Sequence, residues 1–462
     1  MDLVDTIAAN TTARSPVELC LSPLFEREYS ALYKGIQELS RRSEIDSIEA
    51  SNEASKSEEA QIQARTLAIA KLIPIPKQKQ FYLWGIDVTP LPRAYAKTLE
   101  DRSIIYQPNT IKGNKPINVG HSYSVLTALP EKEETGQIPW AIPLIVNRVK
   151  SEKTGKQVAS QQLQKILTKE NLPWSNHWSV LVVDSDYSAK SFLSEQSQHP
   201  NLVVVTRVRS NRIFYQSPKP RAKLPKGHPQ WYGEKFDLKD KTTWHQPDEK
   251  VQTQFTTKKS RLLNVRIQSW SNMLMRGSRD CPMHRQPFTL IQIQVSTSEG
   301  IKIWKPMWLI VIGQRRHELT AIEGYQAYRQ RYNIEHLLRF GKQRLLLNAN
   351  STPSVEHEEN WVSLSFLAYV QLWAARKLAS ILPRPWERYL PPKTEGFLTP
   401  SLVQRDMNRI ITEIGTPANS PKRRGFSSGR TEGMIQTKRT RHEVIKKGKK
   451  EKKSESSPRI AV

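Results

Sequence analysis

The chain has 462 residues, of which 37% are hydrophobic, and a mean hydropathy of −0.60. No apolar run approaches the roughly 18–20 residues that a membrane span needs, and we expect neither a membrane segment nor a secretory signal. Lysine and arginine total 71 against 44 acidic residues, and the net charge of +27 favours a polyanionic partner such as nucleic acid.

The same charge would also suit an anionic membrane surface or ribosomal RNA, so charge alone does not identify the chemistry. The two cysteines, Cys20 and Cys281, do not indicate a disulfide framework, and a reducing cytosolic compartment fits best. Cys281 and His284 have the spacing of half a zinc site, but no second pair of ligands lies nearby in the sequence.

Residues 1–75 are predicted to form a small helical domain. The segment Ser15–Glu18 has the form of a capping box with proline at the first helical position, and apolar residues then recur at helical intervals as far as Leu39. A proline-rich linker at 73–77 ends this region.

Strands and helices alternate in the next part of the chain. We predict strands at 81–88, 116–129, 140–149, 178–185 and 201–208, with helices at 157–169 and 188–197. The run at 178–185 is short and apolar, which is typical of a buried parallel strand. The order β-β-β-α-β-α-β predicts a mixed, ribonuclease-H-like sheet flanked by helices, in which the first and fourth strands are neighbours.

The pattern changes after residue 208, and we predict a β-rich insertion over 209–317. Residues 209–260 show little periodicity, whereas 287–296 and 301–313 predict an antiparallel pair. A long helix at 321–347 and a second at 360–381 then complete, within 318–385, the catalytic domain that begins at 78–208. Residues 392–462 are strongly basic and are expected to be a disordered tail that binds phosphate without a fold.

Three carboxylates stand at positions that such a sheet would bring together. Asp87 and Asp184 lie at strand ends, and Glu335 lies in the long helix after the insertion. Converging carboxylates suit two divalent cations, which prefer oxygen ligands and promote in-line displacement at phosphorus when they lie about 3.5–4 Å apart. Asp87 could instead simply begin a turn, Asp184 could cap the next helix, and Asp186 could cap the helix at 188–197.

The long helix carries the more specific pattern. Tyr328, Arg331, Glu335 and Lys342 fall within an arc of roughly 60° on one helix face, and an apolar stripe that includes Ile334 adjoins them. Cations beside bound phosphodiester would orient it. The alternative is an ordinary surface ion pair between Arg331 and Glu335, although this is the less favourable orientation of such a pair.

These spacings resemble a known family. Tyr328-x2-Arg331-x3-Glu335-x6-Lys342 matches the Tyr-Arg-Glu-Lys signature of bacterial insertion-sequence transposases of the DDE type, and the resemblance extends over roughly residues 80–380.

Two weaker motifs precede the helix in the order of that family. WGIDVTPLPR resembles its first motif, with Asp87 as the ligand, and VVDSDYSAKSF resembles its second, with Asp184 and Tyr187 on the matching positions. Asp186 stands where the family has glycine, so the choice between Asp184 and Asp186 as the ligand remains open.

The resemblance implies a DNA transposase that binds terminal inverted repeats of a mobile element, cleaves the ends and joins them to target DNA. It implies two Mg²⁺ ions, replaceable by Mn²⁺, on Asp87, Asp184 and Glu335, and no small-molecule cofactor. The residues expected to position DNA phosphates are Tyr328, Arg331 and Lys342. Trp231 and Trp244 are candidates for base stacking.

The same resemblance implies a homodimer on double-stranded DNA, in the cytoplasm and associated with the nucleoid, with residues 1–75 contributing end recognition. Two alternatives remain. One is a ribonuclease-H-like nuclease or resolvase that cuts without joining strands. The other is a domesticated, non-catalytic nucleic-acid-binding protein.

Overall fold

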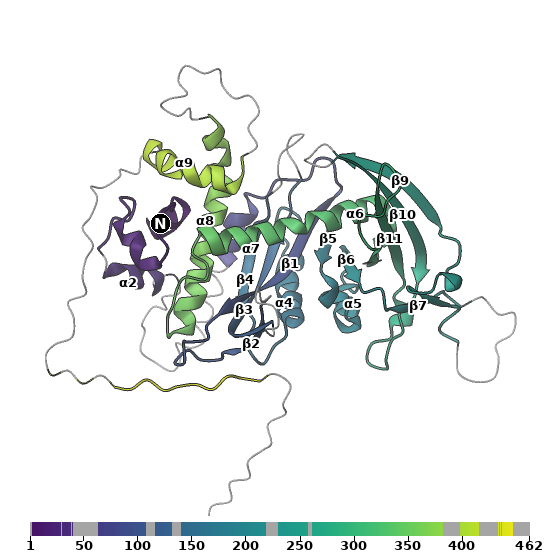
Figure 1. Ribbon diagram of the computed structural model, residues 1–462, viewed down its shortest axis with the longest axis horizontal. Coiled ribbons are helices and arrows are strands. Elements are labelled where there is room, and N and C mark those ends of the chain that lie inside the picture. Colours follow the sequence, from purple (N-terminus) through teal and green to yellow (C-terminus); the bar gives the residue numbers. More distant parts are fainter. Residues whose placement is uncertain are drawn as a thin grey trace, which may run out of the picture.

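The computed structural model describes residues 2–28, 30–37, 39, 63–107, 116–131, 140–218, 230–256, 261–381, 398–414, 433, 435 and 437–446. Within these residues a mixed sheet of ten strands forms the centre of the molecule (Figure 1). Its strands are β1 (Phe81–Pro92), β2 (Ser103–Tyr106), β3 (Ile117–Ala128), β4 (Ile142–Arg148), β5 (Trp178–Val183), β6 (Leu202–Val208), β9 (Glu249–Thr256), β10 (Leu262–Met273), β11 (Phe288–Thr297) and β12 (Met307–Ile312). Their order is β2-β3-β1-β5-β6-β12-β11-β10-β9, and β4 pairs with β3.

The predicted neighbours in this sheet are neighbours in the structure. β1 pairs in parallel with β5, and β5 pairs in parallel with β6, whereas β1 and β3 are antiparallel. Every residue of β5 is buried, as its apolar run predicts for a strand covered on both faces. This confirms the prediction of a large mixed sheet flanked by helices.

Helices cover both faces of the sheet. On one face lie α6 (Ala321–Gln330) and α7 (Tyr332–Arg344), which run across the sheet in Figure 1. On the other face lies α4 (Gly155–Leu167), whose Gln162 bonds Ser124 of β3. The helix α5 (Lys190–Gln196) packs against α4.

The insertion extends the central sheet. β12 pairs with β6, and β11, β10 and β9 follow in antiparallel order. The predicted pair at 287–296 and 301–313 corresponds to β11 and β12. A small hairpin of β7 (Ile213–Tyr215) and β8 (Lys235–Asp237) lies beside them.

The N-terminal segment is helical where it is described. Its elements are α1 (Asp2–Ala8), the 3-10 helix η1 (Pro16–Leu21), α2 (Ala31–Gln37) and a helix at 63–70. At η1 the Ser15 hydroxyl bonds the Glu18 carboxylate and makes no side-chain cap bond to the backbone, so the predicted capping box is absent. α1 and α2 pack on the long helix α8 (Val355–Ile381), and their apolar side chains belong to the same buried cluster as the sheet.

Part of the predicted disordered tail is folded. Residues 400–413 form the helix α9 (Pro400–Glu413), which packs on α8 through Val403, Met407 and Ile410. Residues 437–446 lie beside β2, where the His442 amide donates to the Lys97 carbonyl and the Ile445 amide to the Arg102 carbonyl. In these stretches the structure differs from the expectation of disorder across 392–462, because an amphipathic apolar face and the carbonyls of Lys97 and Arg102 provide contacts that composition does not show. The rest of that range lies outside the described residues.

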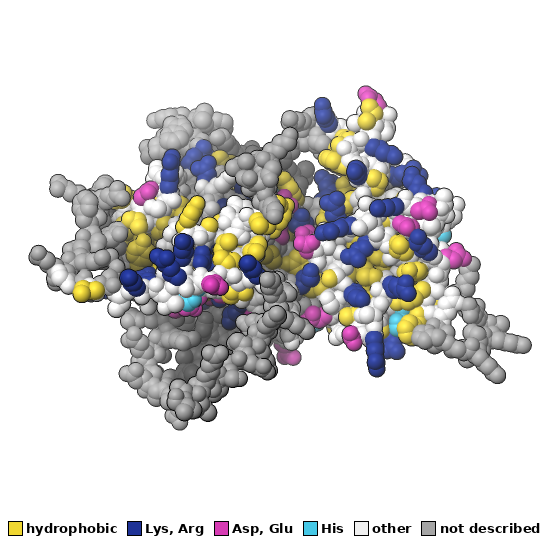
Figure 2. Space-filling view, turned by 60° about the horizontal axis from the view of Figure 1, so that its bottom comes forward, with side chains coloured by type: hydrophobic (Ala, Val, Ile, Leu, Met, Phe, Trp, Pro, Cys, Tyr) yellow, Lys and Arg dark blue, Asp and Glu magenta, His cyan; other side chains and the backbone are white. Residues whose placement is uncertain are grey.

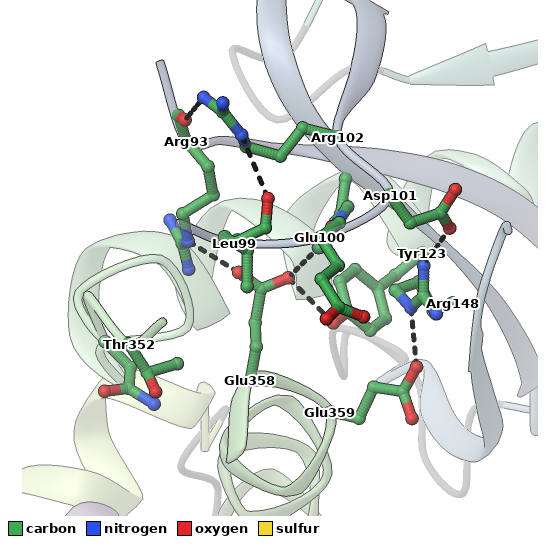
Figure 3. A network of polar contacts seen from close by, with 12 residues as sticks. Arg93, Leu99, Glu100, Asp101, Arg102, Tyr123, Arg148, Thr352, Glu358 and Glu359 are labelled. Carbon is green, nitrogen blue, oxygen red and sulfur yellow. Dashed lines mark hydrogen bonds and ion pairs between the residues drawn. The ribbon is translucent and has the colours of Figure 1, made fainter. Parts of the chain in front are cut away.

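A buried polar network ties α8 to the sheet near the end of β1 (Figure 3). The Glu358 carboxylate is fully buried and lies 2.6 Å from Arg93 Nε and 2.7 Å from His121 Nδ1, and it accepts a 2.9 Å hydrogen bond from the Tyr123 hydroxyl. Arg102 donates to the carbonyls of neighbouring loop residues. Since Glu358 is on α8 and its partners are on or beside β1 and β3, these bonds fix the helix against the sheet.

In the described part of the chain, no helix is both long and apolar enough to cross a bilayer.

Candidate active site

The register of the sheet places the two predicted aspartates next to each other. Gly85 of β1 pairs with Val182 of β5, and Asp87 and Asp184 each follow their member of this pair by two residues. Because side chains alternate along a strand, the two carboxylates share one face of the sheet. β1 continues to Pro92 along β3, so Asp87 lies where the pairing with β5 ends and not at the end of the strand, as the sequence had suggested.

The surroundings of Asp87 and Asp184 raise the pKa values of both carboxyl groups. Burial raises the pKa of the Asp87 carboxyl to about 6, the nearby charge of Arg331 opposes this rise, and the charges of Asp184 and Glu335 add to it. Burial also raises the pKa of Asp184. Two partly buried carboxylates with raised pKa values form a site that favours cations.

The helix that carries the signature is divided in two. In place of one helix over 321–347, α6 and α7 meet at Arg331, where the Arg331 amide donates to the Tyr328 carbonyl at 3.2 Å and the Ile334 amide to the Arg331 carbonyl at 3.0 Å. These i to i−3 bonds are those of a 3-10 turn. The backbone at Arg331 stays right-handed (φ −50°, ψ −32°), so the chain continues in nearly the same direction.

Arg331 links the helix pair to the first aspartate. Its Nη1 lies 3.5 Å from Asp87 Oδ2, and its Nη2 lies 3.0 Å from Glu335 Oε1. The Tyr328 ring lies beneath the guanidinium, 5.8 Å from centroid to Cζ. The ion pair between Arg331 and Glu335 does form, but it is not the isolated surface pair that was the alternative, since it also reaches Asp87 and only 15% of the Arg331 side chain is exposed.

A glycine allows α7 to lie this close to β1. A Cβ atom at Gly85 would be 2.4 Å from Ile334 Cδ1, well inside any normal contact. Gly85 precedes Asp87 by two residues and shares its face, while Ile334 precedes Glu335. The Ile334 side chain therefore fills the space that a Cβ at residue 85 would occupy, on the face that carries Asp87.

Lys342 lies two helical turns beyond Glu335 on α7. Its ammonium donates a 3.0 Å hydrogen bond to the Pro90 carbonyl of β1. Burial lowers the pKa of Lys342, and the charge of Asp87 opposes that change. Lys342 therefore adds a cation to the same edge of the site.

The structure distinguishes between the two neighbouring aspartates. The Asp184 carboxylate accepts the Asp186 amide at 3.0 Å and caps the short helix η3 (Ser185–Ser188). The Asp186 side chain is 71% exposed and lies 3.7 Å from Arg209. Asp186 does not cap α5 as had been considered, because α5 begins at Lys190 after Ala189 and has no side-chain cap. Asp184 is thus the aspartate beside Asp87.

Two further residues border the site: Arg207, which nothing in the sequence singled out, and Tyr187, which matched the family motif but was not assigned a role. Arg207 of β6 follows Val205, the partner of Val182, by two residues, so the register places it beside Asp184 on the same face. The Tyr187 hydroxyl is buried and has no hydrogen-bond partner among the described residues. Burial, followed by the charges of Asp87 and Asp184, raises its pKa.

The donor atoms fit a divalent cation, although they are not grouped as a three-ligand site. Asp87, Asp184 and Glu335 offer carboxylate oxygens, which Mg²⁺ and Mn²⁺ prefer. Within the residues that the structure describes, no three His, Cys, Asp or Glu side chains are grouped so that they could hold a metal ion. The Arg331 guanidinium bridges Asp87 and Glu335, so binding of a cation by both would require it to release at least one of them.

The two candidate stacking residues lie in different surroundings. Trp244 stacks on Phe236 at 5.7 Å and donates its ring N–H to the Asp237 carbonyl at 2.7 Å. Trp231 is 42% exposed and stacks on His284 at 4.3 Å. Trp231 is therefore the more accessible of the two rings.

Comparison with known proteins concerns the part of this site that lies at the strands, namely Asp87 and Asp184. No curated protein matches the chain. The sequence model of the DDE superfamily endonuclease family matches residues 3–275, which is more than half of the 462 residues and includes Asp87 and Asp184. The match ends before α7, so the case for Glu335 rests on the contacts of that helix. The chain belongs to the DDE superfamily endonuclease family.

Proposed function

We propose that this protein is a DNA transposase that binds the terminal inverted repeats of a mobile element, cleaves its ends and joins them to target DNA. The observation that carries the proposal is the juxtaposition of two carboxylates from neighbouring strands, with a third connected to them through Arg331. Asp87 and Asp184 lie side by side on β1 and β5, and Arg331 connects Asp87 to Glu335 on α7.

In this proposal Asp87, Asp184 and Glu335 hold two Mg²⁺ ions, for which Mn²⁺ can substitute. When bound, the ions would activate the attacking oxygen and stabilise the leaving oxygen at phosphorus. The protein's own groups orient the DNA. Arg331 and Lys342 offer charge-assisted hydrogen bonds to phosphate oxygens, and Tyr328 supports the Arg331 guanidinium from below.

Other parts of the proposal concern assembly and recognition. We assign residues 1–75 to recognition of the element end, Trp231 and Trp244 to base stacking, and the active form to a homodimer on DNA. The chain's +27 net charge supports binding to polyanionic DNA. The domains that we assign are 1–75, the catalytic domain of 78–208 and 318–385, the insertion of 209–317 and the basic segment of 392–462.

The test is an assay that separates cutting from joining. The purified chain is incubated with Mg²⁺, a duplex that carries the element end, and a supercoiled target plasmid. Transposition predicts both a nicked or cut end and a product in which that end is covalently joined to the plasmid. Asp87→Asn, Asp184→Asn and Glu335→Gln should abolish both products, whereas the matched variant Asp186→Asn should retain them.

A second function is favoured by the family itself, which is described as an endonuclease family. Cleavage without any joined product would identify a ribonuclease-H-like nuclease or resolvase. Full activity in the cell with Asp87→Asn would instead indicate a non-catalytic nucleic-acid-binding protein and would refute the catalytic assignment.

A further inference from the structure

A basic groove opens in the insertion beside the candidate active site. Its volume is about 840 Å³, and Ser185, the residue after Asp184, is part of its lining. Six cationic residues that border it come from three separate parts of the chain. They are Arg207, Arg209, Lys239, Lys241, Lys302 and Lys305. The groove therefore reaches the ends of β5 and β6 at Ser185 and Arg207.

The sheet beneath these cations contributes polar side chains on the face opposite to α6, because the neighbouring Ile291 is the residue that approaches Gly324 of α6. Gln268 of β10 pairs with Gln292 of β11, and Arg266 pairs with Gln294 two residues further along. Paired residues on adjacent strands share a face, and all four line the groove. Glutamine amides donate and accept hydrogen bonds, and arginine adds a seventh cation.

The charge of the groove restricts what can occupy it. None of the described residues that line it is acidic. In Figure 2 lysine and arginine side chains gather over the insertion side of the molecule. Seven cations drawn from β6, β10 and two connecting segments are spread too widely for one small anion. Cations distributed in this way suit an extended polyanion whose phosphates each contact one or two of them.

We propose that this groove binds the backbone of the duplex DNA that flanks the phosphodiester held at Asp184. The proposal rests on the proposed function and adds the path that the DNA takes away from the carboxylates. The lysines contact phosphates, and the glutamine floor supplies hydrogen bonds that are independent of charge. Binding of this kind is only weakly dependent on sequence and strongly dependent on salt.

The test compares two quadruple variants by fluorescence anisotropy with a labelled duplex of mixed sequence, titrated at several salt concentrations. The first carries Lys239→Gln, Lys241→Gln, Lys302→Gln and Lys305→Gln. The control removes four lysines that line a separate groove beside α4, with Lys150→Gln, Lys153→Gln, Lys165→Gln and Lys169→Gln. Thermal melting checks that both variants are folded.

We expect the groove variant to bind more weakly, with a slope of log affinity against log salt that is shallower by about 3–4, since each lost phosphate contact contributes about 0.9. The control should keep a slope close to that of the wild type. A second variant, Gln268→Glu, should weaken binding at low salt by introducing one negative charge into the floor.

Three results would overturn the proposal. These are an unchanged slope in the groove variant, an equal loss in the control, and groove-dependent binding of an RNA duplex more tightly than DNA. The outcome is separate from that of the proposed function. If the salt slope depends on the groove lysines but the protein never cleaves DNA, DNA binding in the groove is supported and the transposase function is refuted. If the groove variant cleaves normally and its salt slope is unchanged, the transposase function stands and DNA binding in the groove is refuted.

Discussion

Arg331 is the residue on which the site depends most at the scale of single side chains. It contacts Asp87 and Glu335 at the same time, and α6 ends and α7 begins at this residue. A guanidinium between two carboxylates competes with any cation that binds them. A phosphate that draws the guanidinium away would therefore favour metal binding.

This competition predicts the behaviour of Arg331→Gln. Without DNA, the variant should bind Mn²⁺ more tightly than the wild type, by roughly tenfold or more, because a unit charge a few ångströms away is removed. Isothermal titration with MnCl₂ measures the change. The control is Arg209→Gln, whose partner Asp186 is exposed, and it should leave Mn²⁺ affinity unaltered. Weaker Mn²⁺ binding by Arg331→Gln would contradict the competition.

The raised pKa of Asp87 gives a prediction for pH. A carboxyl with a pKa of about 6 is protonated below that pH and cannot then bind a cation. Mn²⁺ affinity should therefore fall by up to about tenfold per pH unit below 6 and level off above it. In Asp87→Asn the Mn²⁺ affinity should be lower than in the wild type, and it should change less between about pH 5 and 7. An unchanged profile would show that Asp87 is not the titrating ligand.

Buried Glu358 is important for stability more than for chemistry. Burial by itself would raise the pKa of Glu358, but the His121 hydrogen bond and the Arg93 charge outweigh it, and the pKa is lowered. Glu358→Gln leaves Arg93 without its counter-charge and should lower the free energy of unfolding by about 3–5 kcal/mol in urea denaturation. Glu318→Gln, which removes an exposed pair with Arg315, should have little effect.

The sign of the pH effect provides a second check on Glu358. Because its folded pKa is lowered, the ionised carboxylate stabilises the fold above its unfolded pKa, and this contribution is lost as the pH falls through the folded pKa. The Gln variant should lack this part of the acid destabilisation. If the wild type and the variant lose stability in parallel on acidification, Glu358 does not contribute in this way.

At the scale of elements, the contact of α7 with β1 sets the geometry of the site. Gly85→Ala would place a methyl group 2.4 Å from Ile334 Cδ1, so the Ile334 side chain, and α7 with it, should shift. A displacement of about 1 Å at Glu335 should reduce DNA cleavage on the order of 100-fold. Ile334→Val removes Cδ1, so the double variant should recover much of the lost activity.

Ile334→Val alone is the control for this pair, since it should cost about 0.5–1.5 kcal/mol of stability and little activity. A double variant that is no more active than Gly85→Ala would show that the close approach is not the cause of the loss. The measurement is the initial rate of cleavage of the end duplex, together with thermal melting of each variant.

The elements also show what the sequence could and could not predict. Strands such as β5 were predictable because an apolar run of that length is typical of a buried strand. β9 was missed because its burial alternates between exposed and half-buried, which leaves little apolar signal at the edge of the sheet. The turn at Arg331 was also missed, since helical periodicity continues through it with only local i to i−3 bonds.

At the scale of the whole molecule, pairing between distant segments completes the site. Asp87 and Asp184 were found from chain order, whereas Arg207 required the parallel register of β5 and β6. The basic groove also could not be found from chain order, because it forms where β12 of the insertion pairs with β6. Periodicity reports one segment at a time, and such pairings become visible only when the sheet is assembled.

The central claim is that Asp184, and not Asp186, binds a catalytic metal beside Asp87. The most direct measurement is the metal dependence of end cleavage in Asp184→Cys and Asp186→Cys. A thiolate is a softer ligand than a carboxylate and suits Mn²⁺ better than Mg²⁺. We predict that Asp184→Cys is inactive with Mg²⁺ and regains cleavage with Mn²⁺, while Asp186→Cys cleaves with both. A metal switch in Asp186→Cys, or full Mg²⁺ activity in Asp184→Cys, would contradict the assignment.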